Sequence, residues 1–180
     1  RLAERHRLVP LAARHLGSVP SGDVPPDVRD RLAGRLRDTA LRNMLMSGEM
    51  HRVVEELERQ GIPVLVFKGP VLAAQVYGDL ALREFYDLDL LLPLDRIGAA
   101  RDALATRGYA QDVELTPAEE IHWRKTQNVC VLLREGGEYC LELHWRCFPR
   151  HFSFPISTEA LLERSVPVNV AGRAVRGLST

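Results

Sequence analysis

The spacing of hydrophobic residues changes near residue 61 and divides the chain into two parts. From Asp27 to Gln60, apolar residues recur at every third or fourth position, which predicts one long helix that ends at Gly61. Residues 2–16 carry a looser helical pattern, and a turn-rich stretch separates them from the long helix. We therefore expect residues 1–60 to form a helical N-terminal extension.

The second part, residues 61–180, alternates short apolar runs with shorter helical patterns. Two predicted strands flank Glu135-Gly136-Gly137 and two more flank Ala171-Gly172, and both arrangements are hairpin signals. Helices that precede and interleave with short strands are typical of an α+β (α/β-like) fold with a small mixed β-sheet. The predicted strands are 62–67, 87–92, 129–133, 139–145, 166–170 and 174–175, and the predicted helices are 71–77, 94–107, 117–126 and 158–164.

Composition narrows the function classes. The chain has 24 basic residues (Lys and Arg) and 24 acidic ones, and this formal net charge of zero argues against a protein that coats nucleic acid or an anionic membrane. No apolar run reaches the length of about 18 residues that spans a membrane, and Cys130, Cys140 and Cys147 form no zinc or disulfide motif. We therefore expect a cytoplasmic protein. Because the chain stops directly after a predicted strand pair, we also expect it to be a fragment from which a further C-terminal segment is missing.

Asp87 and Asp89 are the sharpest chemical signal in the sequence. They stand two residues apart in a predicted strand, so both carboxylates project from the same face. Two carboxylates on one face of a leucine-rich strand are costly unless a positive group lies between them, and Mg²⁺ binds one or two carboxylates together with phosphate oxygens. A metal site is one interpretation. The other is a strand start, with Asp87 in a turn and Asp89 on a solvent-exposed face.

The strand predicted at 139–145 also alternates, and it places Glu142 and His144 on one face. If this strand lies beside the one that carries Asp87, Glu142 becomes a third carboxylate. Such a group acts as general base toward an acceptor hydroxyl or as a further metal ligand. The alternatives are an exposed Glu142 paired with an arginine, and a half-buried, hydrogen-bonded His144 without a catalytic role.

Lys68 and Gly69 follow the first predicted strand, where the chain turns into a helix. Backbone amides at such a turn cradle phosphate, and glycine lets a phosphate approach closely. Lys68 is one of 2 lysines in a chain with 22 arginines, and Arg83, four residues before Asp87, is a further candidate partner for phosphate. The spacing matches neither the Walker A nor the GxGxxG pattern.

Taken together, these features resemble the DNA polymerase β-like nucleotidyltransferase superfamily. The shared order is a strand that ends in a glycine turn, a short helix, an Asp-x-Asp strand and a later strand with a third carboxylate. Over about residues 50–150, the chain more closely resembles the uncharacterised nucleotidyltransferase family. The sequence that carries this resemblance is LVFKGPVLAAQVYGDLALREFYDLDLLL, followed by LELHW.

The resemblance implies transfer of a nucleoside monophosphate from an NTP to an acceptor hydroxyl, by a nucleotidyltransferase core in residues 61–180. The acceptor would be a small molecule or a protein, and the resemblance does not identify it. The matching residues are Asp87, Asp89 and Glu142 for catalysis and for Mg²⁺ (or Mn²⁺), and Lys68, Gly69 and Arg83 for the phosphates of the NTP.

Two departures from the superfamily pattern keep other functions open. Gly69 is followed by Pro70 instead of the usual serine, so we expect the charge of Lys68 to replace the missing hydroxyl, and the interval from Gly69 to Asp87 is longer than usual. A catalytically degenerate binding module, in a biosynthetic or toxin–antitoxin context, is the main alternative. A metal-dependent phosphohydrolase built from the same carboxylates is a third. We expect no membrane partner, and the balanced charge argues against a nucleic-acid partner.

Overall fold

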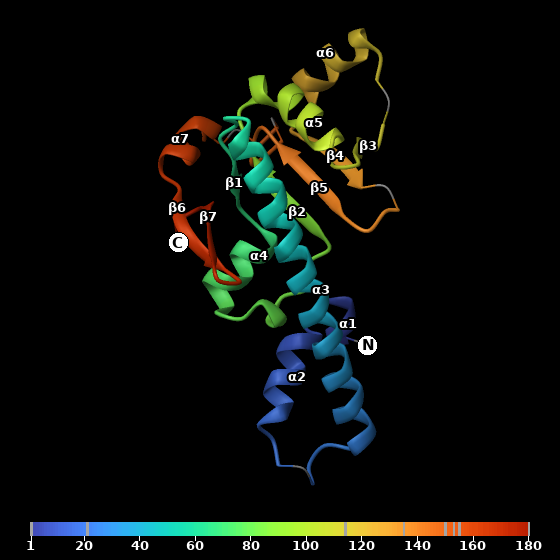
Figure 1. The fold of residues 1–180 in the computed structure, drawn as a ribbon. Helices are drawn as coiled ribbons and strands as arrows, with labels where there is room; N and C mark the ends of the chain where they lie inside the picture. Colours follow the sequence, from blue (N-terminus) through green and yellow to red (C-terminus); the bar gives the residue numbers. More distant parts are fainter. Residues whose placement is uncertain are drawn as a thin grey trace.

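A helical arm and a mixed sheet make up the protein, as the computed structural model in Figure 1 shows. In the arm, α1 (Leu2–Arg5) and α2 (Val9–Gly17) lie against the first half of α3 (Pro26–Arg59). At 34 residues, α3 is about 51 Å long and runs from the arm onto the sheet. The structure describes residues 2–20, 22–113, 115–134, 136–149, 151–152, 154 and 156–179.

Burial separates the two halves of α3. None of its residues before Thr39 is buried, whereas Met50, Val53 and Leu57 in its second half are fully buried in the main core. The helix ends where Gly61 takes a left-handed φ of 68°, as its sequence predicted. The second half of α3 is therefore the part that packs on the sheet.

The main sheet has five strands in the order β1 (Leu65–Val66), β2 (Asp87–Leu91), β5 (Cys140–His144), β4 (Val129–Arg134) and β3 (Tyr109–Gln111). The two central strands, β2 and β5, are parallel, and every other neighbouring pair is antiparallel. The predicted small mixed sheet is thereby confirmed.

The two faces of β2 and β5 differ. On one face, Leu88, Leu90, Leu141 and Leu143 are all 0% exposed and belong to the main core, which α3 and α5 (Ile97–Ala105) also line. The opposite face carries the acidic residues of both strands. At one end of that face a small second cluster forms from Leu65, Leu91 and Leu162, the last of these from α7 (Thr158–Glu163).

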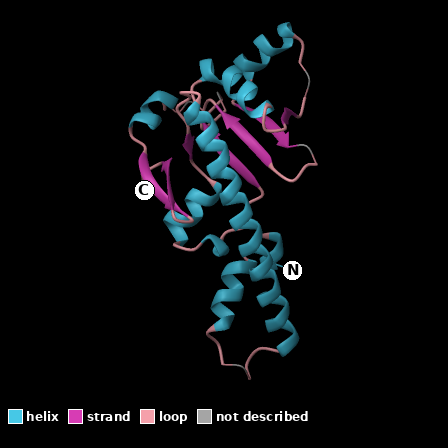
Figure 2. Ribbon diagram, in the orientation of Figure 1, coloured by secondary structure: helices cyan, strands magenta, loops and turns pink. Residues whose placement is uncertain are grey.

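The remaining elements border the sheet. After β1 the chain forms α4 (Gly69–Leu72), which continues as a π-helical turn over Ala73–Tyr77, and a 3-10 turn over Leu80–Leu82. Helix α6 (Pro117–Thr126) packs Trp123 edge-on against Trp145. The hairpin of β6 (Val166–Val170) and β7 (Arg173–Gly177) is a separate sheet beside β1 and α4 (Figure 2). Together these elements complete a mixed α+β fold.

The structure corrects several predicted boundaries. Strand β1 has two paired residues instead of the predicted 62–67, because Pro63 has no N–H to donate to a neighbouring strand. Strand β3 was not predicted, since three residues are too few to show an alternating pattern. The helix predicted at 94–107 begins as a 3-10 turn over Leu94–Arg96, and only Ile97–Ala105 is α-helical.

The predicted hairpin between β4 and β5 is confirmed by its antiparallel pairing, in which Leu133 faces Cys140. Gly136 and Gly137 both take left-handed φ values, 92° and 71°, in the connecting turn. Glu135 lies outside the described residues. Among the helices that the structure describes, none is both long and apolar enough to cross a membrane.

Candidate active site

The pairing of β2 with β5 sets the carboxylates side by side. In this parallel pair Asp89 lies directly opposite Glu142, and Asp87 lies opposite Cys140. All three acidic residues therefore share one face of the sheet, because side chains two residues apart point the same way. Asp89 is 2% exposed, while the side chain of Glu142 is 28% exposed. The predicted placement of Glu142 beside the Asp-x-Asp strand is confirmed.

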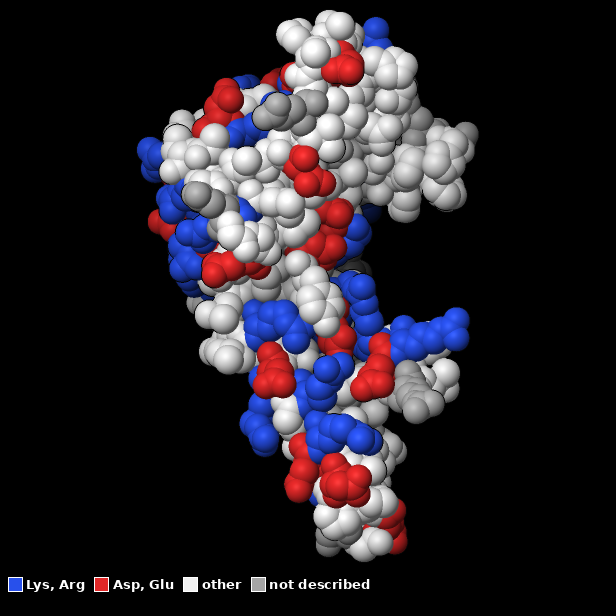
Figure 3. All heavy atoms as spheres, turned by 90° about the vertical axis from the view of Figure 1, so that its right-hand side faces the viewer, with Lys and Arg blue, Asp and Glu red and all other residues white. Residues whose placement is uncertain are grey.

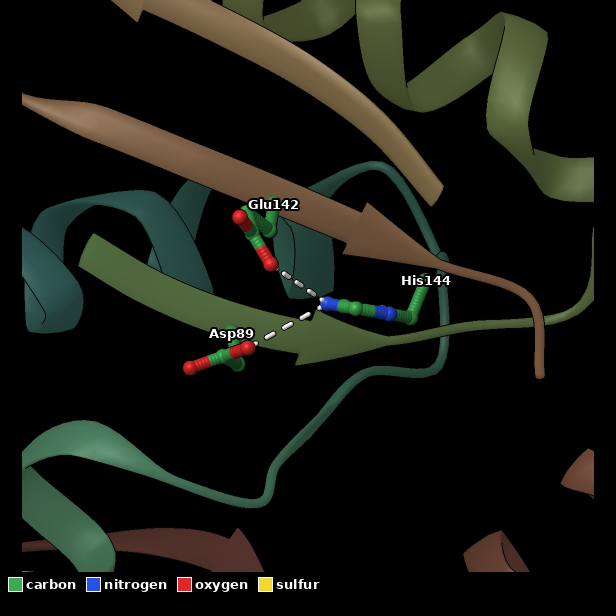
Figure 4. Close-up of side chains that lie close together, drawn as sticks. All are labelled: Asp89, Glu142 and His144. Atoms are coloured by element: carbon green, nitrogen blue, oxygen red, sulfur yellow. Dashed lines mark hydrogen bonds and ion pairs between the residues drawn. The ribbon is translucent and has the colours of Figure 1, made fainter. Parts of the chain in front are cut away.

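His144, at the end of β5, joins two of these carboxylates. Its Nε2 lies 3.2 Å from Oδ1 of Asp89 and 3.0 Å from Oε2 of Glu142 (Figure 4). The ring is held edge-on by Phe67, with 5.1 Å between ring centroids, and its buried Nδ1 has no hydrogen-bond partner among the described residues. His144 thus fixes the separation of Asp89 and Glu142. The sequence placed it on this face but assigned it no role.

Lys68 and Gly69 lie where the same face begins. The Nζ of Lys68 donates to Oδ1 of Asp89 at 2.5 Å, and the lysine side chain remains 45% exposed. Gly69 has a left-handed φ of 51°, and a Cβ at this position would approach the backbone oxygen of Asp87 to 3.4 Å. The turn therefore lies directly against the start of β2. Pro70 follows Gly69 in the first turn of α4.

Arg83 is not in contact with the carboxylates. No hydrogen bond or ion pair joins its side chain to any residue in the described part of the chain, and its Nη1 is buried without a partner. Its backbone oxygen accepts a hydrogen bond of 2.8 Å from the buried side chain of Asn43 on α3. Helix α3 thereby fixes the segment that leads into β2, and with it the place from which Arg83 extends.

Arg42, the neighbour of Asn43 on α3, is a candidate that the sequence did not single out. Its guanidinium carbon lies 4.6 Å from the ring centroid of Tyr86, the residue before Asp87, and its buried Nη1 also lacks a hydrogen-bond partner within the described part of the chain. The position gave no signal, because arginines are frequent throughout the helical part. On the face drawn in Figure 3, acidic side chains gather at mid-height, with basic ones directly below them.

Burial and charge shift the pKa values of the face in different directions. For Asp87, burial and then repulsion from Asp89 and Glu142 raise the pKa. Burial would also raise the pKa of Asp89, but hydrogen bonds from His144 and Lys68 outweigh it and lower the pKa. Burial would lower the pKa of His144, but its bonds to the two carboxylates outweigh it and raise the pKa. The face therefore holds more negative charge than its cations neutralise.

The donor atoms fit a hard divalent cation. One atom each from Asp89, Glu142 and His144 lie within 4.8 Å of one another, and Asp87 stands on the same face. Carboxylate oxygens are the ligands that Mg²⁺ prefers. Oδ1 of Asp89 already accepts from Lys68 and from His144, so a metal ion would compete with both groups for this atom.

Comparisons with known proteins identify a family and similar folds. The family described as "Uncharacterised nucleotidyltransferase" matches residues 1–180, and no curated protein sequence is significantly similar. Among solved structures, the chain resembles ANT(2″)-Ia in complex with adenylyl-2″-tobramycin, with a TM-score of 0.50 and 19% identity over 73% of this chain and 68% of that one.

Two further structures are similar. The solution structure of the antibiotic-resistance factor ANT(2″)-Ia gives a TM-score of 0.50 at 19% identity, over 72% of this chain and 63% of that one, so the protein spans less than two thirds of it. The lincosamide antibiotic adenylyltransferase LnuA in its lincomycin-bound form gives 0.49 at 15% identity, over 73% and 79%. At such identities these likenesses concern the fold alone.

Proposed function

The chain belongs to the uncharacterised nucleotidyltransferase family, and from this premise we propose that it transfers a nucleoside monophosphate from an NTP to the hydroxyl of an acceptor. The observation that supports this function best is the pairing of Asp89 with Glu142, on the same face as Asp87 and beside the turn at Lys68 and Gly69. Carboxylates that can hold a metal ion, beside a basic residue at a strand-to-helix turn, are what a metal-dependent transfer from a triphosphate requires.

Asp87, Asp89 and Glu142 would hold Mg²⁺ or Mn²⁺. When bound, such a cation neutralises charge that develops on the phosphates during transfer. The ammonium group of Lys68 contacts Asp89 beside the turn at Gly69. It can therefore release this carboxylate and bind a phosphate oxygen instead. Gly69 lets the turn take its left-handed φ close to the backbone of Asp87, which keeps Lys68 beside the carboxylates.

Arg83 and Arg42 would bind the outer phosphates. Each has a buried guanidinium nitrogen without a hydrogen-bond partner, and Arg42 lies over Tyr86, next to Asp87. An unpaired buried donor is costly, and an anion that accepts from it removes the cost. These two arginines therefore extend the phosphate-binding region from the glycine turn toward the helical arm.

The transfer itself needs one proton acceptor. Glu142 takes the proton of the acceptor hydroxyl, the acceptor oxygen forms a bond to the α-phosphorus, and the bond from that phosphorus to the bridging oxygen breaks, which releases pyrophosphate. Glu142 is the most exposed of the groups in the cluster with Asp89 and His144, so an acceptor can reach it. His144 positions Glu142 relative to Asp89 through its two contacts.

The test uses labelled ATP, CTP, GTP and UTP with Mg²⁺ and a cell extract, followed by detection of a nucleotidylated product. We expect Asp89→Asn to abolish both transfer and Mg²⁺-dependent NTP binding in calorimetry. The matched control is Asp95→Asn, since the side chain of Asp95 is 74% exposed and lies off the acidic face. Unchanged transfer in Asp89→Asn would show that the site assignment is wrong.

A binding module without catalysis is the second candidate. Two observations favour it: Pro70 stands where a serine hydroxyl would contact phosphate, and Lys68 is already paired with Asp89. Calorimetric titration of NTP with and without Mg²⁺ separates the two functions. NTP binding that depends on Mg²⁺, together with product formation, supports the enzyme. A folded protein that binds no NTP, with or without Mg²⁺, supports the binding module.

A further inference from the structure

A pocket of about 570 Å³ lies beyond the C-terminal end of β5, outside the acidic cluster. Its described walls come from the segment after His144 and from the start of α7, and they include Arg146, Cys147 and Thr158. Phe148, Phe152 and Phe154 contribute an aromatic wall, with each ring 45% to 60% exposed. The volume is in the range of small-molecule sites.

A chain of side-chain contacts runs from the pocket to the carboxylates. Cys147 lines the pocket and packs, together with Phe67, against the small apolar cluster at Leu91. Phe67 in turn holds the ring of His144, which contacts Asp89 and Glu142. The side chains of Cys147, Phe67 and His144 therefore connect the pocket with the acidic cluster, and the hydroxyl of a ligand in the pocket would have to extend past them to reach Glu142.

The direction of the strands relates the pocket to the phosphates. The glycine turn at Gly69 lies against Asp87, at the start of β2, whereas the pocket lies past His144, at the end of the parallel strand β5. In phosphoryl transfer the attacking and leaving oxygens stand roughly in line, on opposite sides of the phosphorus. With pyrophosphate leaving toward Gly69, the acceptor hydroxyl must come from the side of the pocket.

Arg146 determines the charge of the ligand that the pocket would bind. Its Nη1 is buried, has no hydrogen-bond partner, and makes no ion pair within the described residues. A carboxylate in the pocket would give this guanidinium a charge-assisted partner through its nitrogens other than the buried Nη1. Glu159 also lines the pocket but is exposed at its rim, so Arg146 sets the charge of the buried part. The exposed phenylalanine rings suit a planar, apolar body.

We propose that this pocket binds the acceptor of the transfer reaction, and that the acceptor is a small aromatic or apolar molecule that carries a hydroxyl and a carboxylate paired with Arg146. The acceptor role in this proposal rests on the proposed function. The pocket and its preference for an anion are independent of it, because they need neither NTP nor Asp89.

The test compares two probes of one shape, 3-(4-hydroxyphenyl)propionate and its neutral amide. Calorimetry on the full chain measures their affinities, and NMR of the indole N–H of Trp145 reports whether they bind in the pocket. We expect the carboxylate to bind more tightly than the amide by about 10- to 100-fold, and Arg146→Gln to remove that difference. Phe152→Ala should weaken both probes equally.

Arg164→Gln is the matched control, since Arg164 is exposed at the end of α7 and does not line the pocket. Equal affinity for both probes, or a carboxylate preference that survives Arg146→Gln, would overturn the proposal. Transfer of labelled NMP to the hydroxyl of the bound probe supports the acceptor role. Arg146-dependent binding without any NTP binding in the same protein would retain the pocket as an anion site and reject both its acceptor role and the proposed function.

Discussion

Two groups of acidic residues in this protein differ in how their charge is balanced. On α3, Glu49 accepts hydrogen bonds from Arg52 and from Tyr109, both at 2.8 Å, and forms an ion pair with Arg134 at 3.2 Å. Both oxygens of Glu49 thus have fixed protein partners. Glu56, two helical turns further, is paired in the same manner.

The acidic face of β2 and β5 has fewer cations. Among the residues that the structure describes, Asp87, Asp89 and Glu142 share Lys68 and His144 alone, and both of these contact the same oxygen of Asp89. The carboxylates of Glu49 and Glu56 are paired with arginine donors. The charge of the acidic face, by contrast, is only partly neutralised. That difference, more than burial, separates a structural acid from a candidate binding site.

The largest effect that tests this difference is expected at Glu142. Glu142→Gln removes the proton acceptor of the proposed reaction but keeps a side chain of the same shape, so we expect the rate of NMP transfer to fall by about 10²- to 10⁴-fold. Thermal unfolding should change little, because the substitution also removes repulsion with Asp87, which raises the pKa of that residue. Transfer rates and melting temperatures are the two measurements.

Glu138→Gln is the matched control, since Glu138 is exposed in the same β4–β5 connection. It should leave both quantities unchanged. A large loss of stability in Glu142→Gln would mean that Glu142 belongs with the structural acids on α3, and the comparison between the two groups would fail.

The opposite outcome is expected at Glu49. Glu49→Gln leaves Arg52 and Arg134 without their carboxylate, and we expect the free energy of unfolding to fall by about 1–3 kcal/mol, a range that allows for the partial exposure of both arginines. Transfer activity below the melting temperature should persist. Chemical denaturation measures the change, with Glu55→Gln, exposed on the same helix, as control. Unaltered stability would contradict a structural role.

The sequence predicted the acidic face because local patterns determine it. Leucines alternate with Asp87 and Asp89 on one strand and with Glu142 on another, and burial of the leucines forces the acids onto one shared face once the strands pair. Lys68 and Gly69 were predicted for a similar reason, since a strand-to-helix turn lies within a few residues of sequence.

Features that depend on contacts between distant segments could not be predicted from the sequence. The bridge from His144 to Asp89 needs the exact offset between two strands more than fifty residues apart, and alternation alone does not set it. Arg42 becomes notable only because α3 carries it to Tyr86. The aromatic wall around Phe152 lies in a segment whose hydrophobic residues have neither the spacing of a strand nor that of a helix.

The smallest expected effect concerns Glu56 and pH. Hydrogen bonds from Arg107, and then from Gln60 and Arg59, lower the pKa of Glu56 from 4.5 to about 2 in the folded protein. A folded-state pKa below the unfolded one stabilises the fold at pH values above 4.5, and that contribution declines as the pH falls toward 2. We therefore expect Glu56→Gln to melt below the wild type near neutral pH, and the gap to narrow progressively in acid. Glu58→Gln, at an exposed position one residue past Leu57, is the matched control. A gap of constant size across this interval would mean that packing, and not the charge of Glu56, accounts for its contribution to stability.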